Sequence, residues 1–227
     1  IIINNDEKES LAWIRKIYPM VRVIENSNDS LGRAWNLGAK NSKGDILWFL
    51  NPDTEMVSRN FQDILREFKN DSDLAVLGPR LLTDLGKSQA WSAGKETSLF
   101  DIALNNLGLP RSRRIWNSQK KIRADWVSGA AFFIRRKAFN LLGGFDESII
   151  RYFEDMDFCR RARKRGLKII FFPDFEVRHY CGGSHKDKKF QKKDFYASQD
   201  YYFKKHLGKT QAFLLGILRK SASFSED

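Results

Sequence analysis

The sequence contains few of the residues that cross-link or ligate: two cysteines and three histidines among 227 residues. Two cysteines, Cys159 and Cys181, exclude a disulfide framework and a cysteine-rich zinc site, because both need more thiols at short, regular spacing. A reducing, cytoplasmic setting is therefore expected. Cys181 lies two residues after His179, but no second Cys/His pair at suitable spacing accompanies it, so a soft-metal site is a weak alternative.

Long hydrophobic runs are also scarce. The apolar stretch at residues 212–218 is far shorter than the ~20 residues that span a bilayer, so it is expected to lie on a membrane or to pack on the domain. Negative charge is scarce too, since 28 acidic against 40 basic residues leave a formal charge of +12 and a pI near 9.7. This imbalance predicts an anionic partner: nucleic acid, a phosphorylated small molecule or a membrane surface.

What the sequence does contain is a regular alternation of strand and helix patterns in its first half. The predicted strands cover residues 1–3, 21–24, 45–50 and 74–78, and the predicted helices cover residues 9–18, 32–40 and 59–68. Such alternation predicts an α/β fold with a right-handed, mostly parallel sheet. The nearly unbroken apolar run at 45–50 is typical of a central parallel strand covered on both faces.

A polar turn, Asn51-Pro52-Asp53, directly follows that apolar strand. In parallel α/β sheets, ligands bind in the crevice beyond the carboxyl ends of the strands. Pro52 would stiffen the turn there, and Asp53 would direct its carboxylate into the crevice. A plain turn is an equally good interpretation of the three residues taken alone, because Asn, Pro and Asp all favour turns.

A helix is predicted over residues 154–165, with three acids in its first turn and basic residues in its last turns. The helix dipole by itself favours this distribution of charge. Helical spacing separates the acids, however, because one of them shares the apolar stripe of the helix. That stripe comprises Asp155, Phe158, Cys159 and Ala162.

The three acids are therefore expected to differ in role. Asp155 should lie at the edge of the buried face, where a carboxylate facing a crevice can have a raised pKa and act as a general base. Asp157 is expected to be an ion-pair partner on the helix surface. Glu154 is expected to orient the site.

Two further segments have both a structural and a functional interpretation. Small residues at Ser128, Gly129 and Ala130 would let another group approach the backbone closely, or would form a β-bulge. His179 follows an apolar strand at residues 175–177, and a lone histidine at a strand end is more often structural or exposed than a ligand.

Basic residues gather in two segments. The loop at residues 110–123 is expected to be a solvated surface, with phosphate or lipid head-group contacts as the alternative. Near the C-terminus, seven lysines between residues 186 and 205 precede the apolar run at 213–218. The lysines alone indicate a solvated face, whereas lysines combined with that run favour peripheral attachment to an anionic membrane.

Seven short segments form an ordered set of motifs along nearly the whole chain. In chain order they read "INNDEKES", "NSNDSLGRAWNLG", "LNPDT", "DWVSGAAFFIRRKAF", "GGFDE", "YFEDMDFCRRARKRG" and "FPDFEVRHYCGGS". The set resembles the motifs of the family 2 glycosyltransferases of the GT-A fold, and most of all the rhamnosyltransferase-like branch of bacterial surface-polysaccharide synthesis. Seven ordered matches are far more specific than any one of them.

The resemblance implies a GT-A fold over residues 1–206, with a Rossmann-like, mostly parallel central sheet and a mixed acceptor-side half. An amphipathic or apolar helix and tail would follow at 207–227. The implied activity is an inverting, metal-dependent hexosyl transfer in cell-surface polysaccharide synthesis, from a dTDP- or UDP-sugar to a glycan or a polyprenyl-diphosphate-linked saccharide. The branch suggests rhamnose as the sugar and the inner face of the plasma membrane as the location.

The resemblance also implies site residues. By motif position, Asp53 and His179 would hold a divalent cation, Mn²⁺ or Mg²⁺, while Asp155 would be the base with Glu154 beside it. Two protein ligands suffice, because phosphate oxygens and water supply the others. The residues expected near the donor or acceptor are Asn4, Asn28, Asn36, Asn51, Asp53, Ser128, Gly129 and Ala130.

Some positions depart from the family pattern. Asn4 stands where the family usually has Asp, and Ser30 replaces an expected glycine. Asn51 occupies the first acid position of the metal motif, although the branch often has Asn there. The start at Ile1, without methionine and already in a strand, predicts that the first family strand and its nucleotide-contacting turn are missing.

Two other classes of function remain open. A nucleotide-sugar-binding pseudoenzyme is the nearer alternative, because a strand is expected to be missing. A basic RNA-binding α/β domain is the more distant one. Trp13, Trp35 and Trp48 fall within the predicted α/β elements instead of alternating with arginines along a groove, so no nucleic-acid partner is expected.

Overall fold

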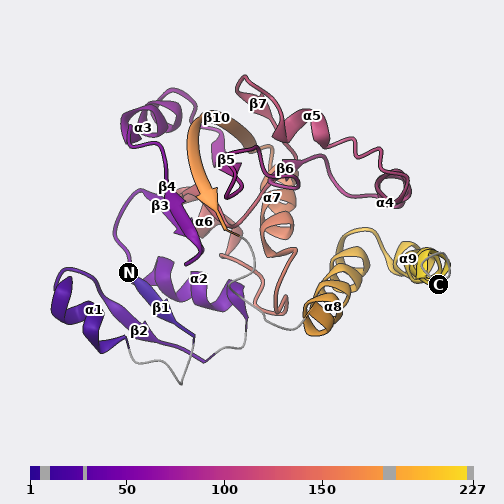
Figure 1. Cartoon of the computed structure of the whole chain (residues 1–227), viewed down its shortest axis with the longest axis horizontal. Helices are drawn as coiled ribbons and strands as arrows, with labels where there is room; N and C mark the ends of the chain where they lie inside the picture. The colour runs from indigo at the N-terminus through magenta and orange to yellow at the C-terminus, as the bar shows by residue number, and fades with distance from the viewer. Residues whose placement is uncertain (6–10, 28–29, 181–187, 224–227) are drawn as a thin grey trace.

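A central mixed β-sheet forms the middle layer of the structure, with helices packed on both faces (Figure 1). The computed structural model describes residues 1–5, 11–27, 30–180 and 188–223. Within these residues, the strand order of the six-stranded sheet is β3 (Ile46–Leu50), β9 (Ala131–Arg135), β5 (Leu74–Leu82), β10 (Lys168–His179) and β4 (Thr54–Met56), with β7 (Ile122–Arg123) also paired to β10. Smaller sheets pair β1 (Ile2–Asn4) with β2 (Val23–Glu25) and β6 (Ala93–Gly94) with β8 (Trp126–Val127).

The helices connect these strands and then form the C-terminal part of the described chain. They are α1 (Ala12–Ile17), α2 (Leu31–Lys40), α3 (Phe61–Asn70), α4 (Leu99–Asn106), α5 (Arg113–Trp116), α6 (Arg136–Leu142), α7 (Glu154–Lys164), α8 (Lys188–His206) and α9 (Lys209–Ser223). Ser30 caps α2, because its side chain accepts a hydrogen bond from the Arg33 N–H at 3.1 Å. Among the described helices, none combines the length and the apolar character that crossing a membrane requires.

The predicted α/β class is confirmed, and each predicted strand and helix of the first half has a counterpart. Parallel pairing joins β1 to β2 and β5 to β10, and β5–β10 is the longest register. Antiparallel pairing, however, also occurs in the middle of the six-stranded sheet. β9 lies between β3 and β5 and runs antiparallel to both.

The prediction that β3 is a central parallel strand is wrong in two respects: β3 ends the strand order, and it pairs antiparallel with β9. Both of its faces are covered nonetheless. Phe49 packs against Trp35 of α2 at 5.7 Å between ring centroids, while Trp48 stacks on Phe133 at 4.9 Å and meets Phe61 of α3 at 5.1 Å. A continuous apolar run in the sequence therefore indicates that both faces of a strand are covered, but it does not predict which strands lie beside it.

Two hydrophobic clusters fill the two faces of the sheet. One joins α3 to the sheet through Ile64 and Phe68. The other gathers side chains from α2, α6, α7 and the C-terminal helices, including the fully buried Phe158, Tyr202 and Leu215. Leu215 belongs to the segment predicted as a separate helix and tail, and it shares this main core.

Asp157 of α7 lies in a buried ionic cluster, so the prediction that it lies on the helix surface is wrong. Its side chain is fully buried, with Oδ2 2.7 Å from Arg161 Nε. Its other oxygen, Oδ1, lies 2.6 Å from Lys205 Nζ and 2.7 Å from His206 Nε2 of α8. The spacing of residues within α7 gives no indication that α8 covers this face. His206 of α8, for example, is 49 residues downstream of Asp157.

These ion pairs determine the charge state of the acid. Burial by itself would raise the pKa of Asp157, but hydrogen bonds from His206, Lys205 and Arg161 outweigh it and hold the pKa well below its usual range. Asp157 is therefore ionised at neutral pH and joins α7 to α8.

We expect Asp157→Asn to lower the free energy of unfolding by about 3 kcal/mol, because it leaves buried cations without their counter-charge. The stabilisation is fully present above the unfolded pKa of 3.8 and is lost as the pH falls from there towards the depressed folded value. Urea unfolding followed by circular dichroism measures both effects.

The matched control is Asp63→Asn, which breaks the exposed pair with Arg66 in α3 and should cost less than about 1 kcal/mol. Equal, small losses in the two variants would contradict the role assigned to Asp157.

Candidate active site

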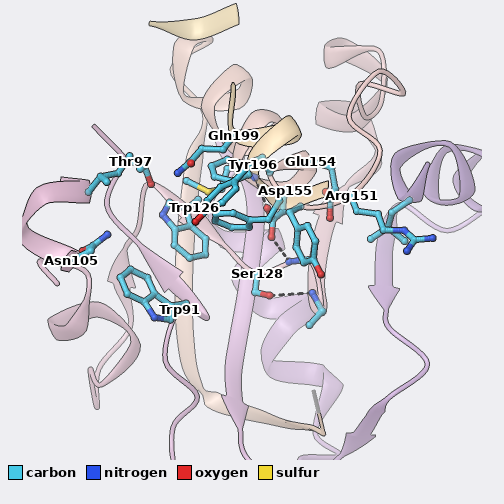
Figure 2. A pocket seen from close by; sticks show the side chains of 18 of the residues that line it. Trp91, Thr97, Asn105, Trp126, Ser128, Arg151, Glu154, Asp155, Tyr196 and Gln199 are labelled. Atoms are coloured by element: carbon cyan, nitrogen blue, oxygen red, sulfur yellow. Dashed lines mark hydrogen bonds between the residues drawn. The ribbon is translucent and has the colours of Figure 1, made fainter. Parts of the chain in front are cut away.

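A cavity of about 780 Å³ lies where several segments of the sheet end and α7 begins (Figure 2). Its wall includes Asn51 after β3, Ser128 after β8, His179 at the end of β10, and Glu154 and Asp155 at the start of α7. Residues of α4, α8 and α9 form another part of the wall. Segments that are remote in the sequence thus place two carboxyl groups, an imidazole and an amide around one space.

The chain enters α7 through a strained turn. Tyr152 and Phe153 have φ values of 64° and 68°, in the left-handed region that large side chains rarely adopt. Phe153 is buried, and its ring lies 5.3 Å from Phe195 and 5.4 Å from Tyr202 of α8. Packing against α8 therefore holds the turn that aims the first residues of α7 at the cavity, a pattern that is frequent at functional sites.

Asp155 is held by backbone hydrogen bonds from two segments. The Gly129 N–H donates to Oδ2 at 2.8 Å, and the Met156 N–H donates to Oδ1 at 2.7 Å. Gly129 itself is required by packing, because a Cβ there would lie 2.4 Å from the Trp35 ring. The close approach predicted for the small residues is thus made by Trp35 of α2, and it fixes the N–H that holds Asp155.

The two acids at the start of α7 differ in their environment. Burial raises the pKa of Glu154 to about 8, and the neighbouring charge of Asp155 adds to this rise. Burial also raises the pKa of Asp155, but its backbone hydrogen bonds stabilise the charged form. The two neighbouring acids are coupled, because a negative charge on Asp155 raises the pKa of Glu154.

Asp53 and His179 come together at another part of the site. Asp53 Oδ1 lies 3.3 Å from His179 Nε2, and both side chains are largely buried. The pairing of β4 with β10 produces this contact, because His179 lies opposite Thr54 and the Tyr180 N–H donates to the Asp53 carbonyl at 2.9 Å. On the other side of the ring, Nδ1 lies 3.0 Å from Gln89 Oε1.

This pair has the composition of a site for a divalent cation. When Nδ1–H donates to Gln89, the neutral ring turns its Nε2 lone pair toward the carboxylate. Asp53 Oδ1 is buried without a hydrogen-bond partner, and a shared cation would satisfy both electron donors. In the part of the chain that the structure describes, no group of three or more His, Cys, Asp and Glu residues suits a metal, so other ligands would come from substrate and water.

Of the other predicted site residues, some line the cavity and some do not. Asn51 lines the cavity, and its N–H donates to the Ala130 carbonyl at 2.8 Å. Ser128, Gly129 and Ala130 also line it. Asn28 lies outside the described residues.

Asn4 and Asn36 are engaged in hydrogen bonds elsewhere. Asn4 is buried at the end of β1 and donates to Glu25 Oε2 at 2.7 Å. Asn36 bonds in both directions with the backbone of Phe145 and donates to Glu147 Oε1 at 2.8 Å. Neither lines the cavity, and their placement near a nucleotide stays a prediction.

Several residues of the cavity wall were not identified from the sequence. They include Gln89, Trp91, Thr97, Asn105, Trp126, Tyr196 and Arg219. They come from loops, from β8 and from α4, α8 and α9. Among them, Trp126 alone lies within one of the seven motifs. The available signal was a group of tryptophans, Trp91, Trp116 and Trp126, of which Trp91 and Trp126 line the cavity.

Residues 1–142 match the sequence family described as Glycosyl transferase family 2. Similar proteins include the N-acetylglucosaminyl-diphospho-decaprenol L-rhamnosyltransferase of Mycobacterium tuberculosis, 37% identical over 31% of this chain and 22% of its own length. The rhamnosyltransferase WbbL of Escherichia coli is 29% identical over 66% of this chain and 57% of its own length. The chain thus spans less than two thirds of the length of either relative.

A solved structure gives an independent comparison of the fold. GalNAc-T7 with UDP, GalNAc and Mn²⁺ superposes with a TM-score of 0.57 at 20% sequence identity, over 78% of this chain and 37% of that one. At this identity the likeness concerns the fold, which is that of the GT-A transferases.

We expect Glu154→Gln to stabilise the protein increasingly as the pH rises from 4.5 to 8. In the folded wild type, Glu154 keeps its proton up to about pH 8, whereas the unfolded chain loses it near 4.5, so wild-type stability falls across this window. The glutamine does not titrate, and its advantage should reach roughly 2–4 kcal/mol at pH 8.

Urea unfolding at pH 5, 6, 7 and 8 measures the difference between the two proteins. The exposed Glu147→Gln is the control and should give a difference that does not change with pH. A constant difference for Glu154→Gln as well would disprove the raised pKa.

Proposed function

Because this chain belongs to glycosyl transferase family 2, we propose that it catalyses inverting transfer of a sugar from a nucleotide-diphosphate sugar to a hydroxyl of a saccharide acceptor. The observation that carries this proposal is the Asp155 carboxylate, held by the Gly129 N–H on the wall of the same cavity that His179 lines. A positioned base and a diphosphate-binding end within one cavity are the two parts that such a reaction needs.

Asp155 would act on the acceptor. Its carboxylate takes the proton of the attacking hydroxyl as the new bond forms between that oxygen and the anomeric carbon. The bond from this carbon to the diphosphate oxygen breaks, and the nucleoside diphosphate leaves with its electron pair. Burial raises the pKa of both acids, and a raised pKa makes the ionised Asp155 carboxylate a stronger base, while the N–H groups of Gly129 and Met156 stabilise its charged form.

Asp53 and His179 would hold Mn²⁺ or Mg²⁺ at the diphosphate end, with Gln89 fixing the ring of His179. When bound, the cation would neutralise the charge that gathers on the leaving diphosphate. Asn51 and Ser128 line the same cavity and offer polar groups to the donor sugar. Asn4, Asn28 and Asn36 are proposed to lie toward the nucleotide.

The relatives suggest the substrates. Two of them are rhamnosyltransferases by name, and one is named for an N-acetylglucosaminyl-diphospho-decaprenol acceptor. We propose a dTDP- or UDP-sugar as donor, with rhamnose as the leading candidate, and a glycan or lipid-diphosphate-linked saccharide as acceptor. Release of nucleoside diphosphate from a panel of UDP-, dTDP- and GDP-sugars, with Mn²⁺ and a short-chain N-acetylglucosaminyl-diphospho-lipid, tests this choice; failure with every pair would contradict it.

A lipid-linked acceptor would bring the protein to the inner face of the plasma membrane. Phe213, Leu214 and Ile217 of α9 are exposed, by 70%, 43% and 50%. With Lys204 of α8, Phe213 and Ile217 border a groove. This combination of apolar and cationic side chains supports peripheral contact with anionic lipid.

We expect Asp155→Asn to abolish transfer, with a loss of at least about 10³-fold in kcat, because the amide accepts no proton from the acceptor. Donor binding should change less than threefold, since the side chain keeps its size. Product formation and donor titration calorimetry measure the two effects. Asp125→Asn, an acid outside the cavity lining, is the control, and retained turnover in Asp155→Asn would exclude the base role.

We expect Asp53→Ala and His179→Ala to remove the dependence of donor binding on Mn²⁺, because each deletes one of the two protein ligands. Titration of the nucleoside diphosphate with and without Mn²⁺ measures this, and the affinity gained from Mn²⁺ should fall at least tenfold. Asp84→Ala, on a surface turn, should leave it unchanged. A wild-type Mn²⁺ effect in both site variants would remove the pair from the cation site.

We expect Phe213→Ser to weaken binding to vesicles containing anionic phosphatidylglycerol by about tenfold, because an exposed aromatic anchor is lost. Vesicle flotation measures the bound fraction, with neutral phosphatidylcholine vesicles as the lipid control. Ile17→Ser, equally apolar and exposed on α1 at the other end of the molecule, should have no effect (Figure 1). Equal binding of all three proteins would contradict membrane contact through α9.

A further inference from the structure

Trp91 is the most exposed aromatic side chain in the cavity wall, at 47% relative exposure. The other two tryptophans of the wall, Trp35 and Trp126, are buried at 8% and 7%. Core packing therefore explains Trp35 and Trp126 but leaves Trp91 unexplained. An indole kept at a cavity surface offers an apolar face to whatever enters.

The backbone of Trp91 is strained. Its φ is 60°, in the left-handed region, which is unusual for a bulky residue. Behind it, the buried Trp116 packs against the ring at 5.0 Å between centroids. Hydrogen bonds fix the adjacent residue, because Ser92 Oγ donates to the Gln89 carbonyl at 2.9 Å. A strained residue with this much support is a candidate for function.

Trp91 is closely connected to both proposed parts of the reaction site. The carbonyl of the next residue, Ser92, accepts from the Ser128 N–H at 2.8 Å, and Gly129, which follows, holds Asp155. Two residues before Trp91, Gln89 contacts His179. Figure 2 shows Trp91 below Trp126, on the side of Thr97 and Asn105, with Glu154 and Arg151 on the other side of Ser128.

We propose that Trp91 is a stacking platform for a pyranose ring of the acceptor saccharide, a specificity-determining contact for the transfer. The proposal rests on the proposed function. The C–H groups on one face of a pyranose are apolar and slightly positive, whereas the face of an indole is apolar and negative, so stacking buries both surfaces. Nearby, Thr97 and Asn105 line the same cavity and offer hydrogen bonds to ring hydroxyls.

The position of Trp91 favours the acceptor over the donor. The nucleotide is proposed to lie toward Asn4 at the end of β1. Trp91 lies two residues before β6, and β6 is on the opposite side of the central strands from β1 (Figure 1). Asp155 must face the acceptor hydroxyl, and Trp91 is linked to it through Ser92, Ser128 and Gly129. The acceptor ring would therefore stack on Trp91 while its hydroxyl reaches Asp155.

The experiment uses the full chain with UDP and the diamagnetic Mg²⁺ present, and methyl pyranosides of glucose, galactose, N-acetylglucosamine and rhamnose as probes. Saturation-transfer NMR measures binding of the probes and of UDP in the same samples. In Trp91→Ala, the pyranoside signals should fall at least fivefold, while UDP binding stays within twofold. Trp91→Phe should retain at least half of the signal, because it keeps a ring. Trp13→Ala, exposed by 54% on α1, should behave as wild type.

The outcomes separate this inference from the proposed function. If UDP binds and the pyranosides bind equally to wild type and Trp91→Ala, or do not bind at all, the platform is disproved while the transferase proposal stands. Loss of UDP binding in Trp91→Ala would assign the residue to the donor and overturn the acceptor role. Absence of UDP and nucleotide-sugar binding in the wild type would count against the proposed function itself.

Discussion

The hydrogen bond from the Gly129 N–H to the Asp155 carboxylate is the contact on which the rest of the site depends. It joins the turn between β8 and β9 to the first turn of α7, and thereby links the sheet to the helix that carries the acids. The contact exists because residue 129 has no side chain. Trp35 occupies the space where a Cβ would be, so the backbone at 129 is fixed from one side by an indole and from the other by the carboxylate.

Contacts with α8 also hold α7 in place. Asp157, two residues beyond Asp155, is buried among Arg161, Lys205 and His206, and Phe153 packs against Phe195 and Tyr202. A helix start with two consecutive residues at positive φ would not persist without such packing. The C-terminal helices therefore support the geometry of the site as well as forming part of the cavity wall.

The proposed reaction needs a negatively charged base for the acceptor and positive charge for the diphosphate. A base needs an ionised carboxylate, and the N–H groups of Gly129 and Met156 stabilise that form of Asp155, while burial raises the pKa of the neighbouring Glu154 to about 8. A diphosphate must be neutralised, and the paired Asp53 and His179 provide a carboxylate oxygen and an imidazole nitrogen that a divalent cation could share. The formal charge of +12 acts at longer range and favours the approach of anionic donors and anionic lipid.

The sequence by itself determined the α/β class, the elements of the first half except β4, and the candidate acids and histidine, because strand and helix periods, turn residues and ordered motifs are local properties of a chain. It placed Asp155 on the apolar stripe of its helix, and that residue lines the cavity. It misplaced β3 within the sheet and Asp157 on the surface. Strand neighbours, and the cover that α8 provides, arise from contacts between remote segments. Only the tertiary structure shows that Asp53 lies beside His179, that Trp35 packs against Gly129 and that Trp91 lines the cavity. Each of these features depends on segments that are remote in the sequence, and no local sequence pattern predicts that they approach one another.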